Sequence, residues 1–87
     1  MFCIEEICIK TKINNEQKLK EMAKPIVKFA EEHNAEFYMA YDKDNRLLAH
    51  YEVNGKTLAY CKGVVAEIKQ MFKDIFKCKI EVLLKAY

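Results

Sequence analysis

Two hydrophobic periods alternate along this chain, and they limit its fold more than any single residue does. Segments in which every second residue is apolar give way, twice, to segments in which apolar residues recur every third or fourth position. The shorter period is typical of a strand with one buried face, and the longer one is typical of an amphipathic helix. In chain order, the sequence therefore predicts strand, helix, strand, strand, helix and strand.

The first strand is expected over residues 2–13, and a helix should follow it. The strand alternation is interrupted at Glu5-Glu6, which indicates a bulge or a frayed start. Asn14 or Asn15 is the expected N-cap of the helix, and Asn34 is its expected C-cap. Pro25 should kink this helix or split it into two pieces, because proline has no amide hydrogen to donate. The predicted apolar stripe of the helix is Leu19, Met22, Ile26, Phe29 and His33.

The middle of the chain predicts a hairpin. Residues 36–42 and 46–53 alternate on either side of a run rich in Asp and Asn that is typical of a turn. The second strand of the hairpin should direct Leu47, Ala49, Tyr51 and Val53 inward.

Thr57 is the expected N-cap of the second helix, and a final strand should cover residues 78–87. The predicted stripe of this helix is Leu58, Cys61, Val65, Ile68, Phe72 and Ile75. The final strand should place together Cys78, Ile80, Val82, Leu84 and Ala86.

Asn54-Gly55 leaves one alternative open. This dipeptide is a strong signal for a tight hairpin, so residues 56–61 could form an extra strand in a five-stranded variant. Gly63 would then lie near the start of the helix, where it costs less than inside it. Against this, Leu58 and Cys61 continue the helical stripe without a break, which favours four strands.

Two β-α-β halves that share one sheet and cross right-handed generate the ferredoxin-like two-layer sandwich. The predicted fold class is therefore α+β, with βαββαβ topology and an antiparallel four-stranded sheet in the order 4-1-3-2. Both helices should cover the same face of the sheet. The length of 87 residues predicts a single domain over residues 1–87.

Composition narrows the function classes. Fifteen basic residues against thirteen acidic ones leave a net charge of only +2, and Arg46 is the single arginine. Because arginine reads phosphate and guanine bidentately and lysine does not, sequence-specific nucleic-acid recognition is disfavoured. No apolar run is long enough to span a membrane and the start lacks the features of a secretory signal, so a cytoplasmic protein that does not bind membranes is expected.

The four cysteines do not have the spacing of a metal site. Cys3, Cys8, Cys61 and Cys78 form no C-x-x-C pair, and their neighbours are largely apolar. Such cysteines pack as small hydrophobic residues, and reduced thiols fit a cytoplasmic location. We therefore expect neither a metal site nor a cofactor.

Short motifs in the strands and the turn carry no chemistry either. The run from Asp42 to Arg46 starts like a calcium loop, but it lacks the glycine at position six and the glutamate at position twelve. Glu5 and Glu6 cannot act as an acid–base pair on one face, because neighbouring strand residues point to opposite sides. We expect them to be ordinary surface charges, and we expect the protein not to be an enzyme.

The sheet face opposite the helices is the candidate binding surface, because this fold leaves it uncovered. Several of its expected residues are apolar, which suggests that a partner covers it. The residues expected on it are Cys8, Lys10 and Lys12 from the first strand, Leu48, His50 and Glu52 from the third, and Tyr38, Ala40, Leu83, Lys85 and Tyr87 from the edges. The partner-binding residues we select are Cys8, Lys10, Tyr38, Leu48, His50 and Leu83.

Three functions fit these expectations to different degrees. The first is a non-enzymatic protein-interaction module of adaptor or inhibitor type, expected to be a homodimer, that binds through the open sheet face or a sheet edge. The alternative is a single-stranded nucleic-acid-binding domain that uses the same face, through Lys10, Lys12, Tyr38, His50 and Lys85. A small-molecule or metal site around Cys8 and His50 ranks lowest.

Overall fold

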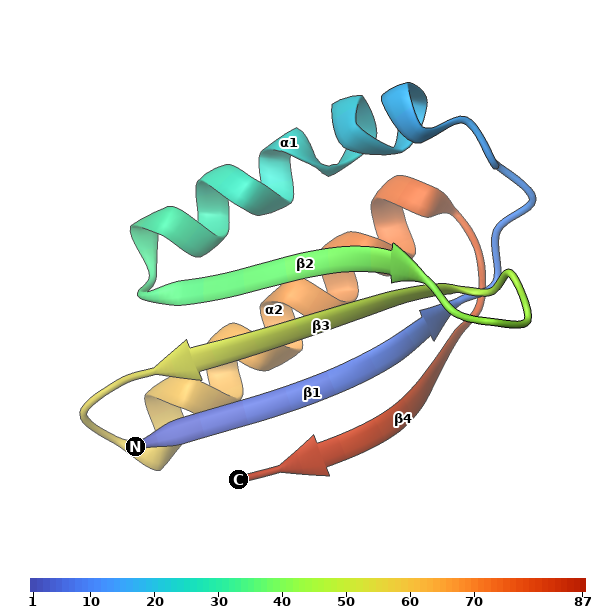
Figure 1. Cartoon of the computed structure of the whole chain (residues 1–87). Coiled ribbons are helices and arrows are strands. Elements are labelled where there is room, and N and C mark those ends of the chain that lie inside the picture. Colours follow the sequence, from blue (N-terminus) through green and yellow to red (C-terminus); the bar gives the residue numbers. More distant parts are fainter.

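The computed structural model describes all 87 residues and contains the six predicted elements in the predicted order. The sheet is antiparallel, its strand order is β2-β3-β1-β4, and both helices lie on one side of it (Figure 1). The predicted ferredoxin-like α+β sandwich is thereby confirmed. The elements are β1 (Phe2–Ile9), α1 (Glu16–Glu32), β2 (Ala35–Tyr41), β3 (Leu47–Asn54), α2 (Leu58–Phe76) and β4 (Ile80–Ala86).

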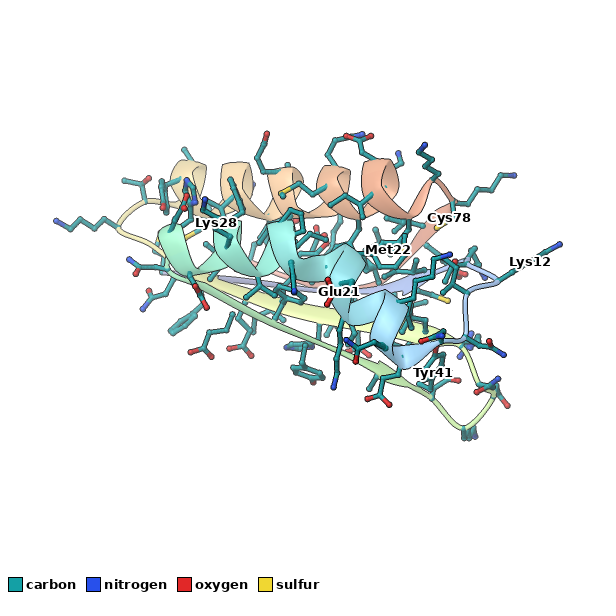
Figure 2. The ribbon with its side chains drawn as sticks, turned by 90° about the horizontal axis from the view of Figure 1, so that it is seen from above. Lys12, Glu21, Met22, Lys28, Tyr41 and Cys78 are labelled. Atoms are coloured by element: carbon teal, nitrogen blue, oxygen red, sulfur yellow. The ribbon has the colours of Figure 1, made fainter.

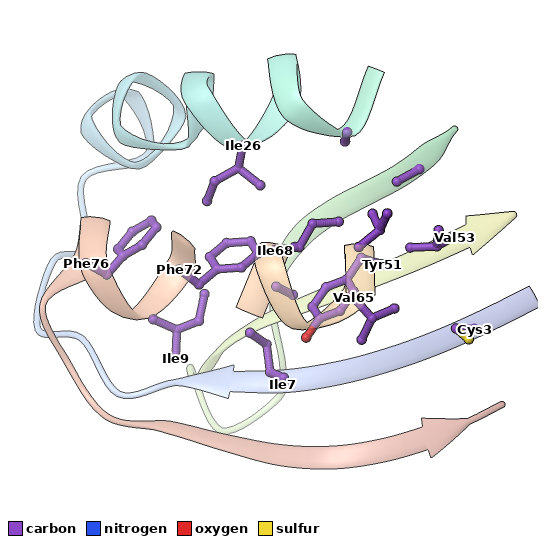
Figure 3. Packing of buried hydrophobic residues seen from close by; sticks show 14 of the residues in the cluster. Cys3, Ile7, Ile9, Ile26, Tyr51, Val53, Val65, Ile68, Phe72 and Phe76 are labelled. Carbon is purple, nitrogen blue, oxygen red and sulfur yellow. The ribbon is translucent and has the colours of Figure 1, made fainter. Parts of the chain in front are cut away.

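The core lies between the helices and the two central strands. Phe72 of α2 is fully buried and stacks against Tyr51 of β3, with ring centroids 6.2 Å apart. Ile26 of α1 and Ile7 of β1 reach the same cluster, which Figure 3 shows from close by. All four inward residues predicted for the third strand are buried, as the two-residue period requires.

Helix α1 is capped as expected and is continuous through Pro25. The Asn15 side-chain oxygen accepts a hydrogen bond from the Lys18 amide at 3.1 Å, which defines the N-cap. The predicted split does not occur. The C-cap is His33 and not Asn34, and Asn34 instead adopts a left-handed backbone with φ 53°. The fully buried positions of the helix are Leu19, Ala23, Ile26 and Ala30, so two alanines bring α1 close to its neighbours.

Helix α2 begins directly after Thr57, whose hydroxyl oxygen accepts a hydrogen bond from the Tyr60 amide at 3.1 Å. The four-stranded interpretation is therefore correct, and Gly63 lies inside the helix. Asn54-Gly55 does not start a hairpin because Gly55 pairs with Met1: each backbone nitrogen donates to the other's carbonyl at 3.0 Å. Neither helix is long and apolar enough to cross a membrane.

Two strand boundaries differ from prediction by more than one residue. β1 ends at Ile9 rather than at residue 13, because the Thr11 amide turns back to donate to the Ile9 carbonyl at 2.9 Å. The predicted partner-binding Lys10 and the neighbouring Lys12 therefore lie outside the strand. β4 begins at Ile80 and not at Cys78.

The irregularity expected near Glu5-Glu6 lies in the facing strand. Glu6 pairs with Leu84, while Ile7 pairs with Val82, so Leu83 is an extra residue in β4. A bulge of this kind reverses the side on which the following residues point. The prediction that the apolar residues of the last strand share one face is therefore wrong beyond Val82.

Candidate functional site

The open sheet face is defined here by residues that are paired across the strands and therefore share one side of the sheet. In Figure 1 this face is turned toward the viewer, and α2 lies behind it. Figure 2 shows the same arrangement from above, with side chains projecting on both sides of the sheet. The open face consists of Phe2, Ile4, Glu6, Cys8, Glu36, Tyr38, Ala40, Leu48, His50, Glu52, Glu81, Leu84 and Ala86.

His50 lies at the centre of this face and is held on three sides. Its two ring nitrogens lie 3.5 Å from a Glu6 oxygen and 3.2 Å from a Glu52 oxygen. The Tyr38 ring stacks on the imidazole at a centroid distance of 5.1 Å. The three strands β1, β3 and β2 thus build one polar and aromatic cluster, of which the sequence had predicted Tyr38 and His50 but not the two carboxylates as partners.

The charge of the open face is negative. It carries four carboxylates, and Lys10 at its margin is paired with one of them, Glu81, at 3.0 Å. Lys85, which we expected on the open face, lies opposite Glu5 in the β1–β4 register. Its side chain is therefore on the helix side of the sheet. A surface of this sign repels a phosphate backbone and favours basic groups.

Apolar side chains surround the polar cluster. Phe2 is 58% exposed, Tyr38 is 62% exposed and Leu84 is 47% exposed, while Leu48 is half-buried between neighbouring strands. Phe2 and Leu84 were not among the predicted site residues. Phe2 lies on this face because β1 alternates regularly and directs Cys3 to the other side. Leu84 lies on it because the bulge in β4 shifts the register after Val82.

The remaining predicted site residues are less accessible or lie elsewhere. Cys8 is on the open face but only 1% exposed, so its thiol is covered by its neighbours. Leu83 is exposed at the bulge, and Tyr87 reaches round to the helix side, where its hydroxyl donates to Glu5 at 2.5 Å. Tyr38, Leu48 and His50 are the predicted residues that the fold brings together with accessible surface.

Glu5 is buried, contrary to the expectation of a surface charge. Its side chain is 0% exposed and accepts hydrogen bonds from the hydroxyl groups of Tyr51, at 2.6 Å, and Tyr87, while the Lys69 ammonium lies 3.4 Å away. Burial, together with the bond to Glu5, raises the pKa of both phenols well above the usual value near 10. The sequence signal was present, because Cys3, Glu5, Ile7 and Ile9 form an unbroken alternation.

The thiols and the acidic side chains form no metal centre. No group of three or more His, Cys, Asp or Glu side chains is arranged so that it could hold a metal ion. All four cysteines are free, and burial raises the pKa of the Cys3 and Cys78 thiols. Raised pKa values lower the fraction of reactive thiolate at neutral pH.

Comparison with known proteins identifies the fold and nothing narrower. No protein-family model matches the sequence, and no curated protein matches it. The solved structure of a de novo designed protein with ferredoxin fold, LFR1 1, superimposes with a TM-score of 0.70 at 15% identity, covering 100% of this chain and 87% of that one. The designed protein Foldit4 gives 0.66 at 16% identity, covering 100% and 98%.

A natural protein also has a similar structure. A C-terminal segment of the alpha subunit of aIF2 from Pyrococcus abyssi superimposes with a TM-score of 0.58 at 12% identity. The match covers 99% of this chain and 51% of that chain. At such identities the similarity extends to the path of the backbone and not to the residues of the open face.

Proposed function

We propose that this protein is a non-enzymatic protein-interaction module that binds a basic protein surface through its open sheet face. The observation that carries the proposal is the combination of exposed apolar side chains with an excess of carboxylates over basic side chains on one face. Tyr38, Phe2 and Leu84 offer area to bury, and Glu6 with Glu52 offers acceptors for lysine or arginine side chains. Buried aromatic anchors surrounded by polar groups are typical of binding hot spots.

The charge of the face bears on which partner it fits. Two copies stacked face to face would bring four carboxylates of one copy against four of the other, which is unfavourable. A homodimer through this face is therefore disfavoured, and a different protein with basic side chains is the better occupant. The same negative charge argues against the alternative of a single-stranded nucleic-acid-binding domain, because Lys10 is engaged by Glu81, Lys85 lies on the other side, and Lys12 lies beyond the end of β1.

Leu48→Asp tests the proposal. An unpaired carboxylate in a desolvated interface should weaken association by about 2 kcal/mol or more. In a nuclease-treated pulldown from a native lysate, we expect the wild-type protein to retain a protein partner that Leu48→Asp loses. Tyr38→Asp serves as a second variant, since its side chain is largely exposed and its substitution spares the core. Circular dichroism should show both variants folded.

Val82→Asp provides the matched control, because Val82 is 38% exposed on β4 and its pairing with Ile7 places it on the helix side of the sheet, outside the open face. It should retain the partner. Equal retention by all four proteins would contradict docking on the open face. A fluorescently labelled single-stranded oligonucleotide that binds the wild-type protein and is released steeply by salt would instead support the nucleic-acid alternative.

A further inference from the structure

The outer edge of β2 carries backbone groups without partners. The Asp42 amide donates to the Arg46 carbonyl and the Asn54 amide donates to the Asn34 carbonyl, which fixes the hydrogen-bonding phase of the β2–β3 ladder. In an antiparallel ladder, alternate residues direct their N–H and C=O groups outward. The residues of β2 that do so are Ala35, Phe37, Met39 and Tyr41, all with side chains on the helix side.

This edge lacks the features by which sheets usually prevent further pairing. From Phe37 to Tyr41 the strand contains no charge, no proline and no bulge. The other edge strand, β4, is interrupted by the bulge at Leu83 and carries Glu81 and Lys85. Charges and bulges on edge strands discourage the addition of another strand. The two edges of the sheet therefore differ, and β2 is the one that can accept a strand.

Helix α1 runs beside β2 (Figure 1), and two hollows lie between these elements. The first, of about 350 Å³, is formed by Val27, Ala30 and Glu31 of α1 together with residues 35–37 of β2. The second, of about 280 Å³, is formed by Leu19, Glu16 and Lys20 of α1 together with residues 39–41 and Leu47. The hollows are centred about four residues apart along β2, and residues four apart in a strand point to the same side.

The charges at the two hollows differ. In the second hollow, Glu16 is paired with Lys20 at 3.7 Å. In the first hollow, Glu31 of α1 forms no ion pair. The end of the groove next to Ala35 is therefore acidic and favours a lysine or arginine side chain.

We propose that the groove between α1 and β2 binds an extended peptide segment of a partner protein, which adds to the sheet as an antiparallel fifth strand. The peptide places two apolar side chains, four positions apart, in the two hollows, and a basic residue follows toward its C-terminal end, beside Glu31. Antiparallel addition continues the pattern of the whole sheet, and main-chain pairing with alternate side-chain pockets is an established mode of peptide recognition. This surface is separate from the open face.

A phage-displayed library of random dodecapeptides, selected on the immobilised protein, provides the first test. Enriched sequences should share two apolar residues four positions apart followed by Lys or Arg. Resynthesised with a fluorescein label, they should bind in anisotropy measurements, and Val27→Lys should weaken them at least tenfold. Val82→Lys is the control, because it replaces a valine that is 38% exposed on β4, away from the groove. It should leave the affinity of the peptides unchanged. Failure to enrich any sequence would overturn the proposal.

N-methylation of the enriched peptide tests strand addition without altering the protein. A peptide residue opposite Ala35, Phe37, Met39 or Tyr41 exchanges both hydrogen bonds with it and directs its side chain to the same side of the sheet, so the peptide residues in the hollows donate their amides to β2. Methylating those nitrogens should abolish binding, and methylating the alternate nitrogens should change it less than threefold. If methylation of either set of nitrogens abolished binding, or if only the alternate nitrogens were required, the antiparallel fifth strand would be overturned.

Charge reversal tests the acidic end of the groove. Glu31→Lys should weaken a basic peptide at least fivefold and should bind better the same peptide with Glu in place of its Lys or Arg. Leu48→Asp, which alters the open face, should not change peptide affinity. A peptide that is lost with Leu48→Asp and retained with Val27→Lys would place the site on the open face and overturn the groove as the docking surface.

Discussion

Glu5 occupies a core position although its one cationic neighbour, Lys69, is less buried than Glu5 itself. The carboxylate is enclosed by the two phenols and lies within reach of Lys69, whose side chain is 27% exposed. A buried acceptor that loses its donor costs about 1–3 kcal/mol, more for a charged group. The hydroxyl groups of Tyr51 and Tyr87 therefore stabilise the fold through Glu5, and Tyr87 also ties the end of the chain to β1.

Tyr51→Phe is expected to change the alkaline stability of the protein. The folded state holds the Tyr51 proton more tightly than the unfolded state does, because burial and the bond to Glu5 raise its pKa above the usual 10.0. The resulting stabilisation is complete below about pH 10 and is lost as the pH rises further, since the unfolded chain ionises first. Tyr51→Phe should melt lower at pH 7 and should show a smaller fall in Tm between pH 9 and 11 than the wild type.

Tyr38→Phe is the control for this measurement, because the Tyr38 side chain is 62% exposed and makes no contact with Glu5. Its Tm should follow the wild-type curve across the same pH range. Parallel curves for the wild type and Tyr51→Phe would show that the buried phenol does not contribute to the pH dependence.

At the scale of elements, the two helices are specified by their caps and stripes, and both tolerate one unfavourable residue. α1 contains Pro25 and α2 contains Gly63, yet both helices are continuous. Tertiary packing of an amphipathic face contributes more to helix stability than the propensity of single residues. The strands are specified less completely, because the bulge in β4 depends on the pairing partner and not on the strand's own period.

Gly63→Ala should stabilise the protein by about 0.5–1 kcal/mol. A methyl group at this position would meet no atom within 4 Å other than those of its chain neighbours and its own helix backbone, and alanine loses less conformational freedom in a helix than glycine does. Urea denaturation followed by circular dichroism measures the change. Gly55→Ala is the contrasting variant, since its methyl group would lie 2.5 Å from a Tyr60 ring carbon, and it should destabilise. A destabilised Gly63→Ala would mean that this helix position is constrained in a way that the free space does not show.

At the scale of the whole molecule, the helix layer and the open face have separate roles. Phe72 contacts Phe37, Tyr51 and Phe76 and thereby joins α2 to two strands. None of the core residues labelled in Figure 3 comes from β4. The exposed residues of the open face, and Val27 and Glu31 beside the groove, are not part of this cluster, so substitutions at these positions can alter binding without unfolding the domain.

Phe72→Ala is expected to cost about 3–5 kcal/mol, which approaches the total stability of a domain of this size. Lys10→Ala, at the exposed margin of the open face, should change the free energy of unfolding by less than about 0.5 kcal/mol. Thermal melts of the two variants beside the wild type measure the difference. Similar melting of Phe72→Ala and the wild type would mean that the Phe72 ring is not part of the core.

The sequence by itself determined the element order, the helix N-caps at Thr57 and at Asn14 or Asn15, and the inward face of β3, because these depend on local periodicity and on side chains that bond to nearby backbone. Tertiary structure alone decided the rest. The partner of Glu5 is Tyr51, 46 positions away, and the bulge that turns Leu84 to the open face exists only in the pairing of β4 with β1. The sign of the open face and the groove beside β2 likewise arise from side chains that separate elements bring together. Contacts between residues distant in the chain leave no local period, so they become visible only in the folded protein.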